Sequence, residues 1–293
     1  MTMQTITSCQ NARIKHLALL QQKSAERRKT GMFVVEGQRE IQRCAEAHCQ
    51  ILTLYVCPEI MEASARMGNT EWAAEMQRGE TPFDICSRKC PNAEIVSVSA
   101  EVYEKIAYRG GTEGVVATAR MPEKTLESLS CSLALNAGNT PPPLIMVLEG
   151  VEKPGNLGAV FRTADAAGAT AVIVCNPLTD LYNPNLIRAS LGAVFNVPCA
   201  LASSQDTIEW LKQHGISILT AQLQDSNLYY DTDMTRPTAL IMGTEATGLT
   251  SQWREAADAH IRIPMLGHCD SLNVSVSAAI LLYEGVRQRN EKH

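Results

Sequence analysis

The second half of the chain alternates short apolar runs with amphipathic segments. The apolar runs predict strands at 144–149, 171–175, 194–199, 216–221, 239–242 and 259–263. The segments between them predict helices at 156–167, 184–192, 204–214, 250–257 and 274–289. Strands that alternate with helices of these lengths are typical of a mostly parallel sheet with helices on both faces.

Chain-breaking residues fall where these helices should begin and end. Gly168 and Gly215 stand where a helix C-terminus favours a left-handed residue. Asn183 followed by Pro184 is a capping residue before a proline in the first turn of a helix. These residues support an α/β fold for this half.

The first 120 residues show the same alternation on a smaller scale. They predict helices at 11–29, 37–47, 59–78 and 99–107, and strands at 33–36, 51–56, 95–98 and 114–118. Residues 121–143 are rich in serine and end in three prolines, which favour an extended connector. We therefore expect a smaller α/β domain over 1–120, a linker over 121–143 and a larger α/β domain over 144–293.

Three apolar runs of the larger domain end in polar loops that contain glycine. The run at 144–148 leads to Asn156–Gly168, the run at 239–242 to Gly243–Leu249, and the run ending at Ile263 to a loop that closes at Asn273. Ligands of α/β proteins bind at the carboxyl ends of strands. Loop backbone groups that lead into a helix N-terminus can hold a polar cofactor.

Arg162 follows the first of these loops and has the apolar or small neighbours Ala159, Phe161 and Ala164. We expect it to be partly enclosed, and a guanidinium is suited to a phosphate or carboxylate. Glu245, between Gly243 and Gly248, is either a solvated loop carboxylate or a group that orients Arg162 or accepts a proton.

Asn156, Asn273 and Ser275 stand at helix starts, where capping alone would explain them. Their spacing does not decide between a cap and a ligand. No glycine pattern of a dinucleotide site or of an ATP phosphate loop is present. The acidic ribose partner of a nicotinamide-dependent oxidoreductase is also missing, which disfavours that class.

The net charge of −5 is unevenly distributed. The first 43 residues hold eight basic and three acidic side chains, whereas residues 121–293 hold 11 basic and 17 acidic ones. This basic segment is either a solvated helix face or a surface that contacts RNA phosphates. The candidate RNA-binding residues are Arg13, Lys15, Lys23, Arg27, Arg28 and Lys29.

Composition and the absence of targeting patterns indicate the class of the protein and its location in the cell. Hydrophobic residues make up 45% and charged residues 19% of the chain, as in ordinary globular proteins. The N-terminus has no secretory pattern, and no run approaches the ~20 apolar residues of a membrane helix. We expect a cytoplasmic protein whose ten cysteines are free thiols and which binds neither metal nor membrane.

Three motifs carry a resemblance to a known family. The segments NLGAVFRTA at 156–164, GTEATGL at 243–249, and IPM followed by SLNVSVSAAI at 263–280 resemble the signature motifs of the SpoU family of RNA ribose 2′-O-methyltransferases, in the SPOUT superfamily. The resemblance covers residues 144–289 closely. Residues 1–120 resemble, more weakly, the L30e-like substrate-binding domain found in this family.

The resemblance implies a C-terminal domain with a trefoil knot that holds S-adenosyl-L-methionine, in a homodimer whose active sites borrow groups from the partner. It implies a central catalytic role for Arg162, supported by Asn156, Glu245, Asn273 and Ser275. It also implies that the cofactor pocket includes Thr220, Ala221, Gly243, Ile263, Met265 and Leu272.

The expected reaction is methyl transfer to a ribose 2′-hydroxyl, with ribosomal RNA favoured by the L30e-like domain and transfer RNA as the alternative. A member of the fold that binds RNA without catalysis is the competing hypothesis. The intact Asn156, Arg162, Glu245 and Asn273 count against it.

Overall fold

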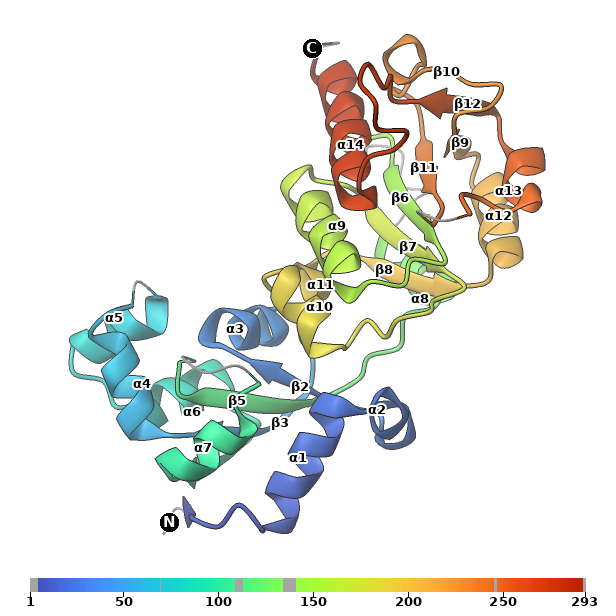
Figure 1. Ribbon diagram of the computed structural model, residues 1–293. Helices are drawn as coiled ribbons and strands as arrows, with labels where there is room; N and C mark the ends of the chain where they lie inside the picture. The colour runs from blue at the N-terminus through green and yellow to red at the C-terminus, as the bar shows by residue number, and fades with distance from the viewer. Residues whose placement is uncertain (1–4, 69, 109–112, 134–140, 245–246, 292–293) are drawn as a thin grey trace. The chain divides into compact units, whose positions relative to one another are not determined.

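The computed structural model describes residues 5–68, 70–108, 113–133, 141–244 and 247–291. The chain forms two compact units (Figure 1). The N-terminal unit comprises residues 1–122 together with 181–196, and the C-terminal unit comprises 123–180 together with 197–293. The backbone therefore passes between the units three times.

The N-terminal unit is built on a five-stranded sheet in the order β1-β4-β3-β5-β2. The strands are β1 (Thr5–Ile6), β2 (Met32–Glu36), β3 (Ile51–Val56), β4 (Glu94–Val98) and β5 (Val115–Arg120). β4 runs parallel to both β1 and β3, whereas β5 is antiparallel to β3 and β2.

Helices cover both faces of this sheet. α1 (Ala12–Gln22) and α7 (Ala100–Ile106) bury Leu17 and Val102 against one face. α3 (Gln38–Glu46) lies on the other face (Figure 1). The remaining helices of this stretch are α2 (Ser24–Thr30), α4 (Pro58–Ala65), α5 (Glu71–Gln77) and α6 (Pro82–Lys89).

Residues 181–196 lie between two strands of the C-terminal sheet in sequence, yet they pack in the N-terminal unit. They form α10 (Pro184–Ala189) and α11 (Ala193–Asn196). The fully buried ring of Phe33 lies 4.5 Å from that of Tyr182 and 5.8 Å from that of Phe195, measured between ring centroids. Aromatic packing therefore holds this segment against β2.

The C-terminal unit contains a seven-stranded sheet in the order β10-β12-β9-β11-β6-β7-β8, and every pair is parallel. The strands are β6 (Leu144–Glu149), β7 (Ala171–Cys175), β8 (Cys199–Ala202), β9 (Ser217–Ala221), β10 (Asn227–Leu228), β11 (Thr238–Met242) and β12 (Ala259–Arg262). Every residue of β6, β7 and β11 is buried, as expected for parallel strands covered on both faces.

Two groups of helices cover this sheet. α9 (Pro154–Ala166) and α14 (Val274–Asn290) lie side by side on one face (Figure 1). α8 (Leu126–Leu133), α12 (Ser204–Gln213) and α13 (Ser251–Ala256) pack on the other, where Trp253 is fully buried. A short 3-10 helix, η1 (Tyr229–Asp231), follows β10. Among the described residues no helix is both long and apolar enough to cross a membrane.

The predicted mostly parallel α/β architecture is confirmed, and several of its details are wrong. The expected strand at 194–199 is the helix α11, and β8 begins only at Cys199. The expected helix 11–29 is two helices, because Lys23 adopts an extended conformation with φ −119° and ψ 111°. The expected helix 59–78 is also two helices, and α6 was not predicted.

The expected linker at 121–143 contains α8, whose Leu129 is buried in the core of the C-terminal unit. The helix-end predictions hold. Gly168 and Gly215 have φ of 64° and 61°, and the side chain of Asn183 caps α10.

Candidate active site

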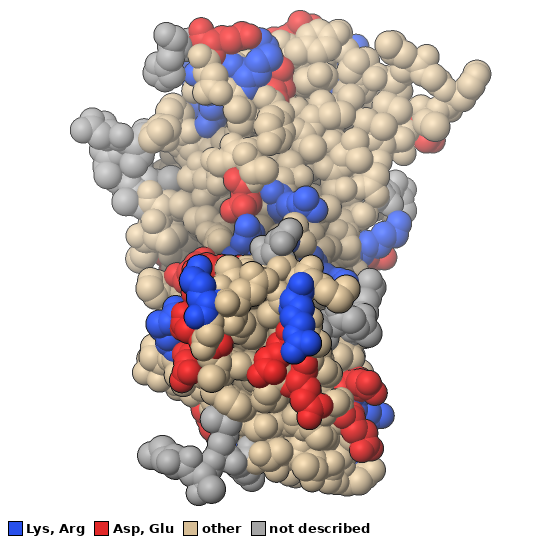
Figure 2. Space-filling view, turned by 90° about the vertical axis from the view of Figure 1, so that its left-hand side faces the viewer, with Lys and Arg blue, Asp and Glu red and all other residues tan. Residues whose placement is uncertain are grey.

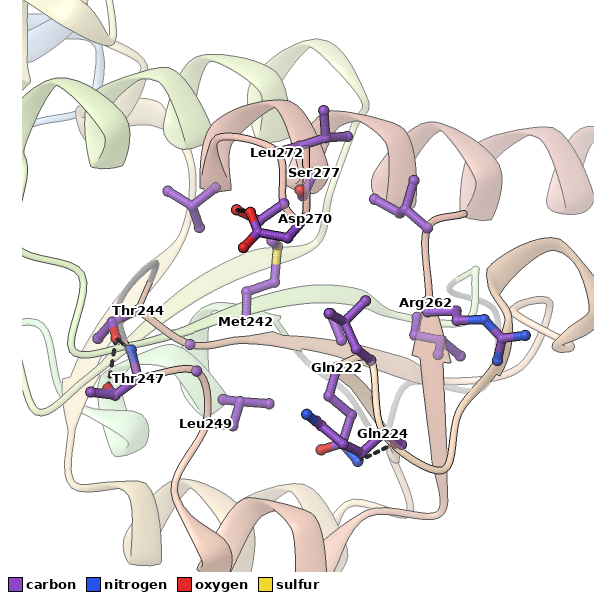
Figure 3. A pocket seen from close by; sticks show the side chains of 18 of the residues that line it. Gln222, Gln224, Met242, Thr244, Thr247, Leu249, Arg262, Asp270, Leu272 and Ser277 are labelled. Atoms are coloured by element: carbon purple, nitrogen blue, oxygen red, sulfur yellow. Dashed lines mark hydrogen bonds between the residues drawn. The ribbon is translucent and has the colours of Figure 1, made fainter. Parts of the chain in front are cut away.

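A cavity of about 400 Å³ opens beside the carboxyl ends of β9, β11 and β12 (Figure 3). Its walls come from the loop after each of these strands and from the first turns of α14. Its size is typical of a site for a small molecule or cofactor. The three polar, glycine-containing loops predicted from the sequence thus follow strands of the same sheet. Two of them, the loops after β11 and β12, line this cavity.

Gly243 lets the loop after β11 fold tightly on itself. A Cβ atom at this position would lie 2.3 Å from both the carbonyl carbon and the oxygen of Gly248. Within this turn the backbone amide of Gly248 donates to the carbonyl oxygen of Thr244 at 3.1 Å. The amide of Thr247 donates to the Thr244 hydroxyl at 3.0 Å. The turn leaves backbone groups at the edge of the cavity.

The lining of the cavity is part apolar and part polar. The apolar part includes Met242, Leu249, Ile261 and Val274. Figure 3 shows Gln222 and Gln224 on one side of the cavity and Asp270, Leu272 and Ser277 on another. Such a mixture can hold a flat apolar group together with charged and hydrogen-bonding groups.

Five of the six predicted cofactor residues line this cavity: Ala221, Gly243, Ile263, Met265 and Leu272. The sixth, Thr220, is fully buried, and its hydroxyl lies 2.6 Å from Nδ1 of His260. The prediction that Thr220 lines the pocket is wrong, because its side chain faces the neighbouring strand β12 and not the cavity.

Asn156, Asn273 and Ser275 come together at the starts of α9 and α14. The side-chain amide of Asn273 donates to Oδ1 of Asn156 at 3.2 Å. Oδ1 of Asn273 accepts from the backbone amide of Ser275 at 2.9 Å and from its hydroxyl at 2.7 Å. Asn273 therefore caps α14 and at the same time links the two helices.

Arg162 lies on the exposed side of α9, with Gly155 and Ala166. Its side chain makes no hydrogen bond or ion pair with any described residue. The expectation that it is partly enclosed is wrong for the single chain. Its neighbours Phe161 and Ala164 are buried because they face the sheet and α14, whereas position 162 points the opposite way. Glu245 lies outside the described residues.

Glu149, which sequence reasoning missed, is a buried carboxylate that anchors the loop after β11. Only 4% of this residue is exposed, and Oε1 accepts from the hydroxyl of Ser204 at 2.7 Å. Its two oxygens also accept from the hydroxyl of Thr250 at 2.9 Å and from the Thr250 amide at 3.0 Å. The signal available in the sequence was a glutamate at the end of the otherwise apolar run 144–149, because charged residues are rarely buried unless they are paired.

The predicted RNA-binding residues of the N-terminal segment have different environments. Arg27 is only 2% exposed, and its guanidinium donates to the backbone oxygen of Gln21 at 3.2 Å and to that of Leu20. It is therefore buried between α1 and α2, and the prediction of an RNA contact is wrong. Arg13 forms an ion pair with Glu94 at 2.8 Å.

Lys15, Lys23, Arg28 and Lys29 are exposed. On the face drawn in Figure 2, basic side chains are interspersed with acidic ones and form no broad patch of one sign.

The ten cysteines are free thiols, as predicted. Burial raises the pKa of Cys175 to about 12, so this thiol stays protonated at neutral pH. Within the described ranges, no three His, Cys, Asp or Glu side chains are arranged to hold a metal ion.

Comparison with known proteins yields two family models. The model of the SpoU rRNA Methylase family matches residues 143–283, and that of the MRM3-like substrate binding domain matches residues 11–117. The chain is 40% identical over 184 residues to the 23S rRNA (guanosine-2′-O-)-methyltransferase RlmB of Pseudomonas putida. That alignment covers 62% of this chain and 73% of the relative.

Solved structures match nearly the whole chain. An RNA 2′-O ribose methyltransferase superposes with a TM-score of 0.75 at 39% identity, over 98% of this chain and 99% of the other. An rRNA methyltransferase from Sinorhizobium meliloti with bound AdoMet gives a TM-score of 0.78 at 28% identity, over 97% and 98% of the two chains.

Proposed function

The chain belongs to the SpoU rRNA methylase family, and we propose that it transfers a methyl group from S-adenosyl-L-methionine to a ribose 2′-hydroxyl of ribosomal RNA. The observation that carries this proposal is the cavity formed by the loops after β9, β11 and β12, with Asn156 and Asn273 joined beside it. The RNA acted on by the relative from Pseudomonas putida is 23S rRNA, which favours ribosomal over transfer RNA.

The residues of the cavity fit this cofactor. Met242, Leu249 and Ile263 supply apolar surface for an adenine ring, and the folded turn at Gly243 and Gly248 brings backbone groups to its edge. Asp270 supplies a carboxylate for an ammonium or a ribose, and Arg254 a guanidinium for a carboxylate. When bound, S-adenosyl-L-methionine supplies a methyl group already activated on a sulfonium.

The protein must then place a ribose oxygen in line with that methyl group, and positioning supplies much of the acceleration. In this proposal Asn156, Asn273 and Ser275 form a rigid polar cluster that orients the sugar. Arg162 binds the phosphate next to the target ribose and stabilises the charge that develops on the 2′-oxygen. Its exposed guanidinium, which has no partner among the described residues, is available for this role.

The 2′-hydroxyl must also lose its proton. A guanidinium is a poor base because arginine stays protonated in proteins. We therefore assign Arg162 to phosphate binding and make Glu245 the candidate proton acceptor or orienting group.

The active unit in this proposal is a homodimer. Val276, Ile280 and Tyr283 share one face of α14, and Val276 and Tyr283 are 47% and 49% exposed. An apolar stripe beside the proposed active site fits a second copy of this chain. The partner would then enclose Arg162, which the single chain leaves in solvent. The trefoil knot implied by the motifs and a cytoplasmic location, where ribosomes are assembled, belong to the same proposal.

Substitution of Arg162 tests the function. We expect Arg162→Ala to reduce methylation of ribosomal RNA by at least about 100-fold while S-adenosylhomocysteine still binds with the affinity of the wild type. The assay measures transfer of a radioactive methyl group to RNA from cells that lack the enzyme. Arg236→Ala removes a guanidinium that is 81% exposed in the same unit, and serves as the matched control. Turnover of Arg162→Ala at the wild-type rate would exclude the proposed role.

A further inference from the structure

The N-terminal unit contains a second cavity, of about 220 Å³, which the proposed methyl transfer does not use. All of its lining residues belong to this unit, which includes the segment 181–196. One wall comes from the end of β2 and the start of α3. The opposite wall comes from α10 and the residues that follow it.

The inner lining is apolar, with Val34, Ile187 and Leu191, and the ring of Tyr108 also lines the cavity. The hydroxyl of Tyr108 accepts a hydrogen bond from the side-chain amide of Asn185 at 3.1 Å, which fixes the ring. A fixed aromatic ring above an apolar surface is how proteins stack single-stranded nucleobases.

Three carboxylates, those of Glu36, Glu40 and Glu113, line the same space. Oε2 of Glu36 accepts a hydrogen bond from the backbone amide of Tyr108 at 2.9 Å, so this carboxylate orders the wall. Glu40 is half-buried, and burial raises the pKa of its carboxyl group. A hydrogen bond with the Glu40 backbone lowers this pKa, and the charge of Glu113 raises it. The charges of Arg39 and Arg188 lower the pKa of Glu40 and partly compensate.

Arg39 and Arg188 are exposed, and neither makes a hydrogen bond or ion pair with any described residue. Each nevertheless lines the cavity. Two guanidinium groups at the edge of a cavity that also holds an aromatic ring suit a ligand that has a phosphate at one end and a flat base at the other.

The carboxylate of Glu40 can distinguish among the four RNA bases. An ionised carboxylate only accepts hydrogen bonds, and its two oxygens can accept from two adjacent donors. Of the four RNA bases, guanine alone presents adjacent N–H donors, N1–H and the 2-amino group, on its Watson–Crick edge. Protein modules that read RNA sequence contact this edge in bases that have left the helix.

We propose that this cavity binds a guanosine nucleotide of the substrate RNA, with its base against Tyr108 and the carboxylate of Glu40 and its phosphate on Arg39 and Arg188. The proposal rests on the proposed function in that it takes the ligand to be RNA. It assigns to the N-terminal unit a base-specific contact, in addition to contacts with the phosphate backbone.

Titration with nucleotides tests the proposal in the full-length protein. S-adenosylhomocysteine is first added in excess to fill the C-terminal cavity, and 5′-GMP, 5′-IMP or 5′-AMP is then titrated while amide signals are followed by NMR. We expect 5′-GMP to shift signals of residues around Gly37, Tyr108 and Ile187. 5′-IMP, which lacks the 2-amino group, should bind about 5-fold more weakly and 5′-AMP more weakly still.

Two variants separate the contacts. Arg188→Ala should weaken 5′-GMP binding about 10-fold, whereas Arg66→Ala, which removes another exposed guanidinium of the same unit, should leave it unchanged. Glu40→Gln should remove most of the preference for 5′-GMP over 5′-AMP. Equal binding of the three nucleotides by the wild type, no binding of 5′-GMP, or an unchanged preference in Glu40→Gln would overturn the proposal. Failure of the methyltransferase proposal would appear separately, as loss of S-adenosylhomocysteine binding or of methyl transfer by the wild type.

Discussion

The carboxylate of Glu149 accepts hydrogen bonds from both the backbone amide and the hydroxyl of Thr250, at 3.0 and 2.9 Å. Glu149 ends β6, and Thr250 follows the turn that begins at Gly243. A buried anion at the end of one strand thus fixes the far end of a loop that leaves a neighbouring strand. Ser204, at the start of α12, donates to the same carboxylate at 2.7 Å and completes the anchor.

Loss of this anchor should affect cofactor binding. In Glu149→Ala, the donors on Thr250 and Ser204 lose their buried acceptor, which costs about 1–3 kcal/mol. We expect the variant to bind S-adenosylhomocysteine at least about 10-fold more weakly, as measured by calorimetry at a temperature where it is fully folded.

The exposed Glu255 on α13 offers a matched control, because Glu255→Ala removes the same charge nearby without touching the loop. Glu149→Gln keeps one acceptor oxygen and should recover part of the affinity. If Glu149→Ala bound S-adenosylhomocysteine as tightly as Glu255→Ala does, the binding conformation of the loop would not depend on the Glu149 carboxylate.

The space around Gly243 leaves no room for a side chain. In Gly243→Ala the new methyl group would meet backbone atoms of Gly248 at 2.3 Å, and backbone cannot move aside as a flexible side chain can. We expect loss of detectable S-adenosylhomocysteine binding and a lower melting temperature. Gly155→Ala, at a glycine with open space around its Cβ position, should have little effect on either measurement. A Gly243→Ala protein with normal affinity would show that the turn can open without cost.

The proposed dimer can be tested through Val276, which lies on the apolar stripe of α14. Val276→Asp places a charge in that surface, and we expect monomers in light scattering together with loss of methyl transfer. Leu178→Asp changes another exposed apolar residue, 64% exposed, and should leave the assembly intact. A wild-type protein that is monomeric at micromolar concentration would contradict the proposed interface.

Glu284 makes part of the stability of α14 dependent on pH. Hydrogen bonds from Arg287 at 2.9 and 2.8 Å hold the pKa of the Glu284 carboxyl below its usual range. A carboxyl whose pKa is lower in the folded state stabilises the fold above its unfolded pKa of about 4.3. That stabilisation disappears as the pH falls through the folded pKa.

We therefore expect Glu284→Gln to lower the free energy of unfolding at pH 7 by about 1 kcal/mol, a small value because Arg287 is half exposed. The difference between the two proteins should shrink below about pH 4, where the wild-type carboxyl is increasingly protonated. Urea unfolding at pH 7 and at pH 3.5 gives both values. A difference that is the same at both pH values would mean that the effect is not electrostatic.

Periodicity predicted the parallel sheet because its strands are buried on both faces and are therefore continuously apolar, as in β6 and β11. It failed at 194–199, where Val194 and Phe195 are apolar for another reason. They belong to α11 and pack against the N-terminal unit, a long-range contact that local pattern does not encode. The break at Lys23 is likewise invisible to a helical pattern that continues on both sides of it.

For the site, the motif residues identified the cavity because loops at strand ends share one edge of a sheet. Ala221, Gly243 and Ile263, which were predicted to bind the cofactor, all line this cavity. The direction in which individual side chains point could not be predicted from the sequence. Thr220 is one residue away from Ala221 and therefore points to the other side of its strand. In the sequence, Arg27 cannot be told apart from its solvated neighbours. It is buried because α1 and α2 pack around it, a contact that the sequence pattern does not show.

The excursion of residues 181–196 into the N-terminal unit limits how this protein can be divided or recombined. A fragment ending at residue 122 would leave Phe33 without the rings of Tyr182 and Phe195, and a fragment starting there would carry both rings without their partner. Exchange of substrate-binding modules between relatives would therefore require a matched insert from inside the methyltransferase half. A replacement of residues 1–122 that left 181–196 unchanged would set a foreign strand against the rings of Tyr182 and Phe195.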